Sequence, residues 1–233
     1  MPYQGLVHNL KSLYSIALDA LFPRRCYGCS TYDIFLCVDC QKLIPRRSPV
    51  TTFFEQTPAQ PTGLDSLTSA LFFRTPIVSL LIHDFKFQGI ESLAPILTEY
   101  LLQALEHTSL PLPHVITPVP LHPRRLRDRG YNQSALIANE LTHTLNTPVT
   151  LTAYEPLLKR VHHTPPQSKR HTRESRIIAL KGAFALTNSL TRLENQVIWL
   201  IDDVATTNTT LEECAQILKK AGAKEVHGLV IAH

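Results

Sequence analysis

Two continuous apolar runs, at residues 197–201 (VIWLI) and 226–232 (VHGLVIA), constrain the fold more than any other feature of the sequence. Strands that are apolar on both sides are typical of parallel sheets with helices on each face. Further strands are expected at 67–73, 115–119, 156–160 and 183–186. Helical periodicity occurs at 77–83, 90–105, 132–145 and 210–221. This alternation predicts an α/β fold with a parallel, doubly wound sheet flanked by helices.

The loop after Ile201 carries the first candidate site, because ligands of such sheets bind beyond the carboxyl ends of the strands. Asp202 and Asp203 end the apolar run, the turn ATTNT follows, and a helix is expected from Thr210. A helix N-terminus and threonine hydroxyls can bind a phosphate. Carboxylates would repel that phosphate, so they suit the diol of a ribose or a divalent cation. The alternative is a solvated strand end with a threonine N-cap.

The loop after Val119 carries the second candidate site. It reads TPVPLHPRRLRDRGYNQ, and its prolines restrict the backbone where the loop begins. Four of its residues, Arg124, Arg125, Arg127 and Arg129, offer guanidinium groups that match the oxygen atoms of a pyrophosphate. A departing pyrophosphate needs such neutralisation, from arginine or from Mg²⁺.

A third segment, from about Lys159 to Phe184, is basic, polar and interrupted by two prolines. This composition fits a mobile loop that closes over a bound ligand. The formal net charge of the chain is +4, and Lys and Arg clearly outnumber Asp and Glu between Thr117 and Phe184. The excess indicates either a solvated surface or a site for phosphates or nucleic acid.

Four cysteines, in the sequence RRCYGCSTYDIFLCVDC, predict a small metal-binding domain. Cys26 and Cys29 form one CxxC pair, and Cys37 and Cys40 form another, so two turns can supply four thiolates to one tetrahedral zinc ion. Two disulfides or a redox pair are the alternatives, but the N-terminal segment lacks the pattern of a signal peptide and reduced thiols are expected. Four ligands leave no open position, so a structural zinc is predicted.

The expected domains are an amphipathic helix at 1–22, the cysteine knuckle at 23–50 and the α/β domain at 64–233, with a polar connector from Pro49 to Leu64. No apolar run approaches the roughly 20 residues that span a bilayer. Together with the lack of a signal-peptide pattern, this leads us to expect a cytoplasmic protein. Arginines at positions 24, 25, 46 and 47 bracket the knuckle, and they fit either a contact with a polyanion or an ordinary surface.

The order of these motifs resembles the ComF/GntX family of phosphoribosyltransferase-like proteins, over nearly the full chain from about Leu18. The resemblance rests on the four-cysteine knuckle, FKFQG, PVPLHPRRLRDRGYNQ, an R-x3-T-x2-Q pattern followed by GAF, and IDDVATTNTT. The last stretch is similar to the motif with which type I phosphoribosyltransferases bind phosphoribosyl pyrophosphate (PRPP). Asn208 stands where that motif usually has glycine, and Ala179 stands where the family often has asparagine. Asparagine tolerates left-handed backbone angles better than other residues with a side chain.

The resemblance implies a type I phosphoribosyltransferase-like fold and assigns roles to individual residues. Asp202 and Asp203 would hold the ribose and Mg²⁺, and Arg124, Arg125 and Arg129 the pyrophosphate. The 5′-phosphate would lie against Ala205, Thr206, Thr207, Asn208, Thr209 and Thr210. The mobile loop would include Arg160, Thr164 and Gln167, with Arg176 at the position of a later family arginine.

Three functions follow as hypotheses. The first is an active phosphoribosyltransferase whose acceptor is unidentified. The second is a protein of natural competence that handles incoming single-stranded DNA, with partners in the DNA-import machinery, and the third is a nucleotide-salvage enzyme with no role in DNA. Residues expected to contact nucleic acid are Arg24, Arg25, Arg46, Arg47, Lys86, Arg127, Lys169 and Arg170.

Overall fold

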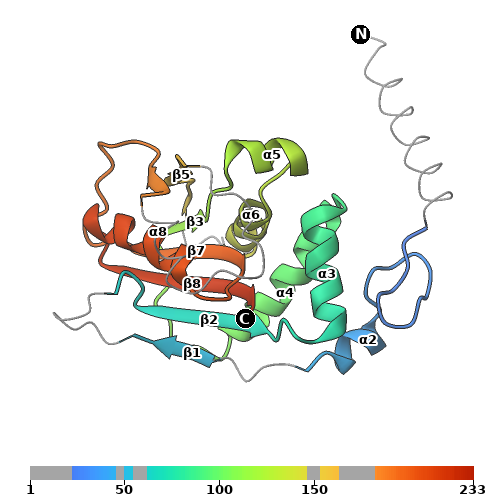
Figure 1. Ribbon diagram of the computed structural model, residues 1–233. Helices are drawn as coiled ribbons and strands as arrows, with labels where there is room; N and C mark the ends of the chain where they lie inside the picture. Colours follow the sequence, from blue (N-terminus) through green and yellow to red (C-terminus); the bar gives the residue numbers. More distant parts are fainter. Residues whose placement is uncertain (1–22, 46–49, 55–61, 146–152, 163–181) are drawn as a thin grey trace, which may run out of the picture. The chain divides into compact units, whose positions relative to one another are not determined.

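The computed structural model describes residues 23–45, 50–54, 62–145, 153–162 and 182–233 (Figure 1). The helix expected at 1–22 lies outside these residues. The chain divides into two compact units, Met1–Pro45 and Arg46–His233, which are described separately here. Among the described residues, no helix has the length and apolar character needed to cross a membrane.

The described part of the first unit is a cysteine-rich loop followed by one short helix. Arg25 and Tyr32 form an isolated antiparallel bridge, which closes the loop that holds the first two cysteines. Helix α2 (Val38–Leu43) begins directly after Cys37, whose side chain accepts a hydrogen bond from the N–H of Cys40 at 3.5 Å. Few large apolar residues are buried here, so a bound metal would supply stability that the small core cannot.

The second unit is built on a six-stranded sheet in the order β1-β2-β8-β7-β3-β4 (Figure 1). Its strands are β1 (Val50–Phe53), β2 (Ser66–Leu71), β3 (Val115–Pro118), β4 (Ala153–Tyr154), β7 (Val197–Val204) and β8 (Glu225–Ala232). All neighbours pair in parallel except β1, which is antiparallel to β2. The predicted α/β fold with a mainly parallel sheet is confirmed. β5 (Leu158–Arg160) and β6 (Phe184–Leu186) form a separate antiparallel pair.

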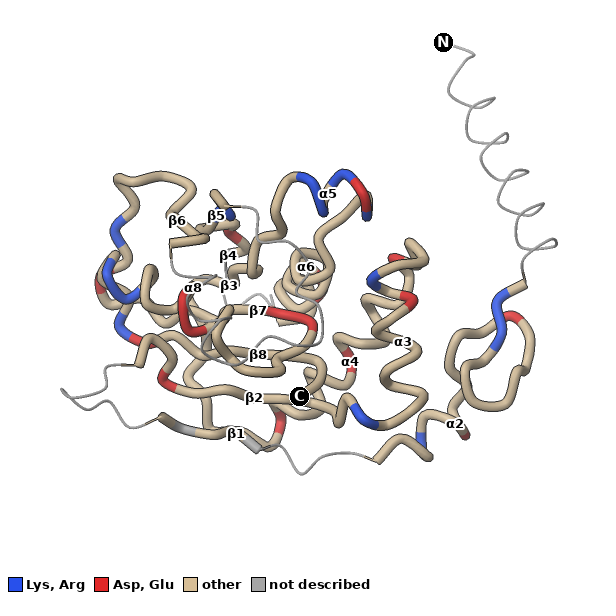
Figure 2. The backbone as a smooth tube through the Cα atoms, viewed as in Figure 1, with Lys and Arg blue, Asp and Glu red and all other residues tan. Residues whose placement is uncertain are grey.

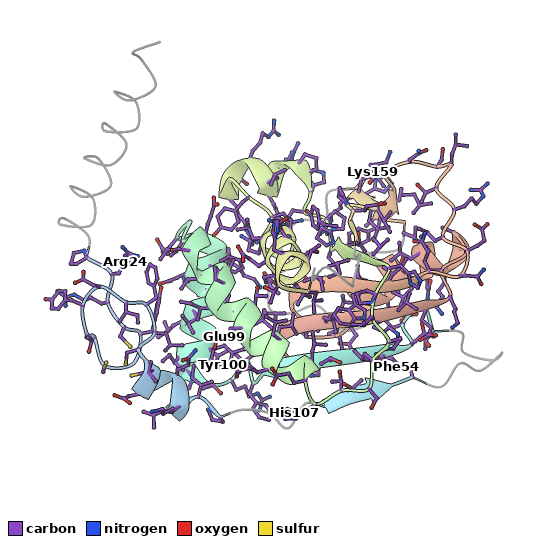
Figure 3. All side chains as sticks on the ribbon, turned by 180° about the vertical axis from the view of Figure 1, so that it is seen from behind. Arg24, Phe54, Glu99, Tyr100, His107 and Lys159 are labelled. Carbon is purple, nitrogen blue, oxygen red and sulfur yellow. The ribbon has the colours of Figure 1, made fainter. Side chains whose placement is uncertain are left out.

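Helices cover both faces of the sheet. The helical elements of this unit are α3 (Pro76–Phe87), the 3₁₀ turn η1 (Glu91–Leu93), α4 (Ala94–Leu105), α5 (Pro123–Arg129), α6 (Gln133–Leu145) and α8 (Thr209–Lys220). α4 and α6 contact each other and pack on the strands, and Tyr100 of α4, labelled in Figure 3, is buried. The connection from β7 to β8 runs in the opposite direction across the sheet, so a right-handed crossover places α8 on the other face.

Four elements differ from the sequence-based expectation, and one of them is β4, which lies where no strand was expected. β1 lies inside the stretch that was expected to be a connector, where four residues find a sheet edge to pair with. α3 continues four residues beyond the predicted end at His83 and stops before Gly89, whose φ of +71° is left-handed. The arginine-rich stretch, expected as a loop, is helix α5, which ends at Gly130 in the left-handed conformation.

Gly63 lies where the chain passes closest to α8. A Cβ atom at this position would lie 2.4 Å from the backbone nitrogen of Gln216 and 2.8 Å from the carbonyl carbon of Ala215. The Gly63 N–H donates to Glu212 Oε1, and the Leu64 N–H donates to Oε2 of the same carboxylate at 3.3 Å. The close approach therefore allows one carboxylate of α8 to hold the chain as it enters β2.

Gly63→Ala is expected to lower the free energy of unfolding by at least about 2 kcal/mol, because the backbone of α8 must shift to admit the methyl group. Gly228→Ala is the matched control: its Cβ would lie closest to the ends of two leucine side chains, at 3.1 and 3.3 Å, which can move, and the carbonyl oxygen of Ser66, at 3.6 Å, is an ordinary contact. Chemical denaturation measures both variants. An equal loss of stability in the two would contradict the close approach of Gly63 to α8.

Candidate functional site

The pairing of β3 with β7 brings the two predicted loops together. Pro118 lies opposite Ile201, and the N–H of Val119 donates to the carbonyl oxygen of Ile201 at 2.8 Å. The chain leaves β3 toward β4 and leaves β7 toward β8, so the connections diverge between these two strands. Such a switch point is where open α/β sheets bind ligands. Figure 2 shows the acidic end of β7 and the basic helix α5 that follows β3.

Asp202 and Asp203, the aspartate pair, lie near the carboxyl end of β7, just before its last residue, Val204. Each of the two carboxylates has a defined partner. Asp202 Oδ1 accepts hydrogen bonds from Ser134 Oγ at the start of α6 and from the N–H of Asp203, both at 2.9 Å. Asp203 Oδ1 lies 3.0 Å from Lys86 Nζ in the last turn of α3. The pair is therefore fixed from two helices before any ligand arrives.

The aspartate pair carries more negative charge than its surroundings neutralise. Burial of the carboxyl group and the adjacent charge of Asp203 raise the pKa of Asp202 to about 7, although Lys86, Ser134 and the Asp203 N–H act in the opposite direction. A divalent cation beside the pair, or the hydroxyls of a diol, would stabilise the charged form. The donor set, two carboxylates and a hydroxyl, is the kind that Mg²⁺ prefers.

The turn formed by residues 205–210 opens α8 with a left-handed residue. Asn208 has φ +55° and ψ −5°, so it adopts the left-handed conformation expected for this position. Its side chain does not cap the helix, and its Oδ1 is buried without a hydrogen-bond partner in the described structure. Thr209 Oγ1 donates to Thr207 O at 3.3 Å and lies 3.1 Å from Thr207 Oγ1. A hydroxyl-rich turn therefore precedes a 12-residue helix. The free N–H groups of the first helical turn and the threonine hydroxyls can together bind a phosphate.

Helix α5 sorts the four predicted arginines into two groups. Arg125 and Arg129 are partly buried and one helical turn apart, whereas Arg124 and Arg127 are exposed. Burial lowers the pKa of Arg129, while the charges of Asp203 and Asp202 raise it. Arg129 Nη1 also donates to Gln133 Oε1 at 3.1 Å. The helix therefore places Arg129 within the field of the aspartate pair, with Arg125 one turn earlier, and leaves Arg124 and Arg127 exposed.

Arg160, at the end of β5, belongs to the same electrostatic neighbourhood. Burial and the charge of Arg125 lower its pKa, and Asp202 raises it. Its guanidinium carbon lies 5.2 Å from the ring centroid of Phe184. Six predicted site residues lie outside the described structure, namely Arg46, Arg47, Thr164, Gln167, Lys169 and Arg170, and Arg176 lies outside it as well.

Two contributors to the site were missed by sequence reasoning. Ser134 binds Asp202, and Phe87 packs under Arg129, whose guanidinium carbon is 4.8 Å from the ring centroid. Ser134 follows directly after RGYNQ, so its place in that motif was a usable signal. Phe87 follows Lys86 in FKFQG, but the prediction ended the helix at His83 and left Phe87 without a position.

The four predicted zinc ligands converge in the first unit. The sulfur atoms of Cys26, Cys29, Cys37 and Cys40 all lie within 4.8 Å of one another, and those of Cys29 and Cys37 are 3.6 Å apart (Figure 3). Sulfur atoms bound tetrahedrally at about 2.3 Å from zinc are about 3.8 Å apart. The cluster therefore fits a metal ion of this kind, and no disulfide joins these cysteines.

The thiols also have the electrostatics of a metal site. Although burial opposes it, backbone N–H groups lower the pKa of Cys26 to about 6. The neighbouring cysteine sulfurs, Cys37 first, together with burial raise the pKa of Cys40 to about 12. Four thiolates at this spacing repel one another, and a cation between them removes that penalty.

Purified protein is expected to contain about one equivalent of zinc, and Cys29→Ser should lose it, because one ligand of the tetrahedral set is removed. Cys214→Ala, which changes the buried cysteine of α8, is the control and should retain the metal. Elemental analysis with a parallel thiol titration measures both. Far less than one equivalent of metal with four reactive thiols in the wild type would refute the site.

The raised pKa of Asp202 predicts a stability that falls as pH rises. The folded state binds this proton more tightly than the unfolded chain, in which an aspartate has a pKa of about 3.9. The contribution of Asp202 is complete below that value and is lost as pH rises through about 7. Relative to Asp202→Asn, the wild type should therefore lose free energy of unfolding between pH 5 and 8. Denaturation of both proteins without ligand measures the difference, and a constant difference would contradict the prediction.

Comparison with known proteins shows that the chain is similar in sequence to proteins named for competence and for DNA utilization. It is 36% identical over 153 residues to competence protein F of Haemophilus influenzae, covering 64% of this chain and 65% of that protein. It is 36% identical over 159 residues to the DNA utilization protein YhgH of Salmonella typhi, and 34% identical over 157 residues to YhgH of Escherichia coli K12. The alignments span 64–65% of this chain and 65% of each relative, so the chain matches less than two-thirds of the length of these relatives.

No protein-family model matches the chain. A solved structure entitled as that of the allosteric regulatory enzyme of purine biosynthesis aligns with a TM-score of 0.37 and 20% identity, over 61% of this chain and 26% of the other. The sequence relatives are the informative result. The chain is a homologue of competence protein F and of the DNA utilization proteins YhgH.

Proposed function

We propose that this protein acts in natural competence, where it handles incoming single-stranded DNA and binds PRPP with Mg²⁺ on a type I phosphoribosyltransferase-like domain. The aspartate pair would hold the ribose hydroxyls and Mg²⁺, and the 205–210 turn would hold the 5′-phosphate. Arg125 and Arg129, with Arg124 at the start of α5, would neutralise the pyrophosphate. The protein would work in the cytoplasm, where the cysteine thiols remain reduced.

The observation that supports PRPP binding is that opposite charges meet beyond the carboxyl ends of β3 and β7. The aspartate pair ends β7, two partly buried arginines follow β3, and the N-terminus of α8 opens beside them. PRPP has the complementary parts: a diol, a monophosphate at one end and a pyrophosphate at the other. Bound Mg²⁺ would supply the electrostatic stabilisation that a leaving pyrophosphate needs.

The described residues give PRPP binding more support than turnover. Asn208 has the backbone conformation of a glycine but adds a side chain, whose Oδ1 is buried at the start of α8. No described side chain stands out as a general base for an acceptor. We therefore assign the site to binding first, with transfer of the phosphoribosyl group to an unidentified acceptor as the enzymatic form of the same proposal.

Two observations favour a role in DNA handling over nucleotide salvage. The relatives are named for competence and DNA utilization. The arginines of α5 include two exposed residues, Arg124 and Arg127, which extend the positive charge beyond the aspartate site. Binding through such residues must weaken as salt rises, because each contact with a phosphate releases condensed counterions.

PRPP with Mg²⁺ is expected to bind the wild type, and Asp202→Asn combined with Asp203→Asn should abolish measurable binding, since both carboxylates that face the diol are lost. Isothermal titration calorimetry at millimolar PRPP measures this. Glu99→Gln combined with Glu106→Gln, which removes the same charge from exposed positions on and after α4, is the matched control.

Two outcomes would contradict the assignment. Absence of heat with wild-type protein that circular dichroism shows to be folded would refute the PRPP site. Equal affinity in the double aspartate variant would move the ligand elsewhere on the chain. Transformation assays on cells carrying the same variant then show whether DNA uptake depends on this site.

A further inference from the structure

A pocket beside the aspartate pair combines an exposed aromatic ring with cationic side chains. It has a volume of about 630 Å³ and lies between the end of α3 and helix α5. Its lining residues are Lys86, Phe87, Gly89, Arg125, Asp128 and Arg129. This volume lies within the range of about 300–1,000 Å³ that is usual for small-molecule sites. It is large enough for one nucleotide unit.

Phe87 is an unusual residue to leave in contact with water, because 59% of it is exposed. Two neighbours hold the ring in place. The Arg129 guanidinium carbon lies 4.8 Å from its centroid, and the His83 ring, one turn earlier in α3, is centred 5.1 Å away at an interplanar angle of 49°. The ring is therefore positioned before any ligand binds, while much of its surface remains open.

The rim of the pocket is open at Gly89. This residue has φ +71°, which a side chain would strain, and a Cβ built there would meet no atom within 4 Å. The backbone of the preceding turn is fixed from α6, since Gln133 Nε2 lies 3.4 Å from the carbonyl oxygens of both Phe85 and Lys86. The ring and the open rim are thus attached to rigid helices.

The charge around the ring matches a phosphodiester. Lys86, Arg125 and Arg129 provide three cations, against the carboxylate of Asp128 in the lining and that of Asp203, which pairs with Lys86 at 3.0 Å. The positive surface continues outside the pocket, because Arg124 and Arg127 are exposed on the same short helix. A free nucleotide would need only the pocket, whereas a polymer of phosphates would use both.

We propose that this Phe87 pocket binds one unstacked base of single-stranded DNA, with the base against Phe87 and the adjacent phosphates against Arg125, Lys86 and the exposed arginines of α5. Stacking on an aromatic side chain tolerates every base, as a protein that takes up arbitrary sequences requires. A base in a duplex is not available for such stacking, so the pocket selects single strands. This inference rests on the DNA half of the proposed function and names the residues that would perform it.

Fluorescence anisotropy with a labelled 20-nucleotide thymidine oligomer at low salt tests the pocket in the full-length protein. Phe87→Ala is expected to weaken binding roughly 5- to 150-fold, the range for loss of one stacked base. Phe87→Trp should retain the wild-type affinity. Leu112→Ala is the matched control. Leu112 is also 59% exposed, but it precedes β3, whereas the pocket lies beyond the carboxyl end of that strand.

An abasic oligomer of equal length separates stacking from a general structural effect. It presents the same phosphates without bases, so wild type and Phe87→Ala should bind it equally and with the same dependence on salt. Unequal binding of the abasic oligomer would show that the variant has lost structure, and would overturn the proposal.

The remaining outcomes distinguish this proposal from the function on which it rests. If the wild type does not bind the oligomer at low salt, DNA handling and the Phe87 pocket both fail, while PRPP binding stands by itself. If the wild type binds and Phe87→Ala binds equally well, only the pocket fails. If Phe87→Ala loses binding of thymidine monophosphate and keeps that of the oligomer, the ligand is a free nucleotide, and single-stranded DNA is excluded from the pocket.

Discussion

The parallel register of β3 and β7 is the constraint on which the site depends. It sets Pro118 opposite Ile201, so helix α5 and the aspartate pair both lie at the carboxyl ends of these two strands. Strand β7 is buried on both faces along its first five residues, and a shift by one residue would exchange the side chains that pack on the two faces. The same shift would move Asp202 away from Ser134 and Asp203 away from Lys86. Core packing thus fixes the position of two carboxylates that contribute nothing to the core.

The aspartate pair is a costly arrangement for stability alone. Two adjacent carboxylates are removed from water, and one lysine and one hydroxyl meet them directly. Buried charges are costly even when paired, and well-packed apolar residues would commonly stabilise the fold as well or better. Burial first, and then the charge of Asp203, raise the pKa of Asp202. A site that awaits a cation or a diol accounts for the arrangement, because the ligand would supply the missing partner.

The sequence predicted those features that depend on local pattern. The buried strands and long helices follow from apolar periodicity, and the left-handed Asn208 follows from its place in the turn. The two-residue strand β4 and the edge strand β1 were missed because pairing partners far along the chain decide them. Helix α5 was read as a loop because of its prolines, although Pro123 occupies its first turn, where a proline is compatible with a helix. That difference matters for the site, because helical spacing puts Arg125 and Arg129 on one partly buried face and leaves Arg124 and Arg127 exposed.

Lys86 links the two proposed ligand sites, because it pairs with Asp203 and also lines the Phe87 pocket. A cation that enters beside the aspartate pair competes with Lys86 for Asp203, and a phosphate in the pocket competes with Asp203 for Lys86. Each event weakens the same ion pair, so at Lys86 each lowers the cost of the other, whereas a pyrophosphate and a DNA phosphate would compete for Arg125. Arg129 interacts with the aspartate charges and packs over Phe87. A ligand that neutralises those charges would leave Arg129 more available to a phosphate in the pocket. Any coupling that passes through these two residues must be reciprocal, because PRPP can change the affinity for DNA only by the factor with which DNA changes the affinity for PRPP.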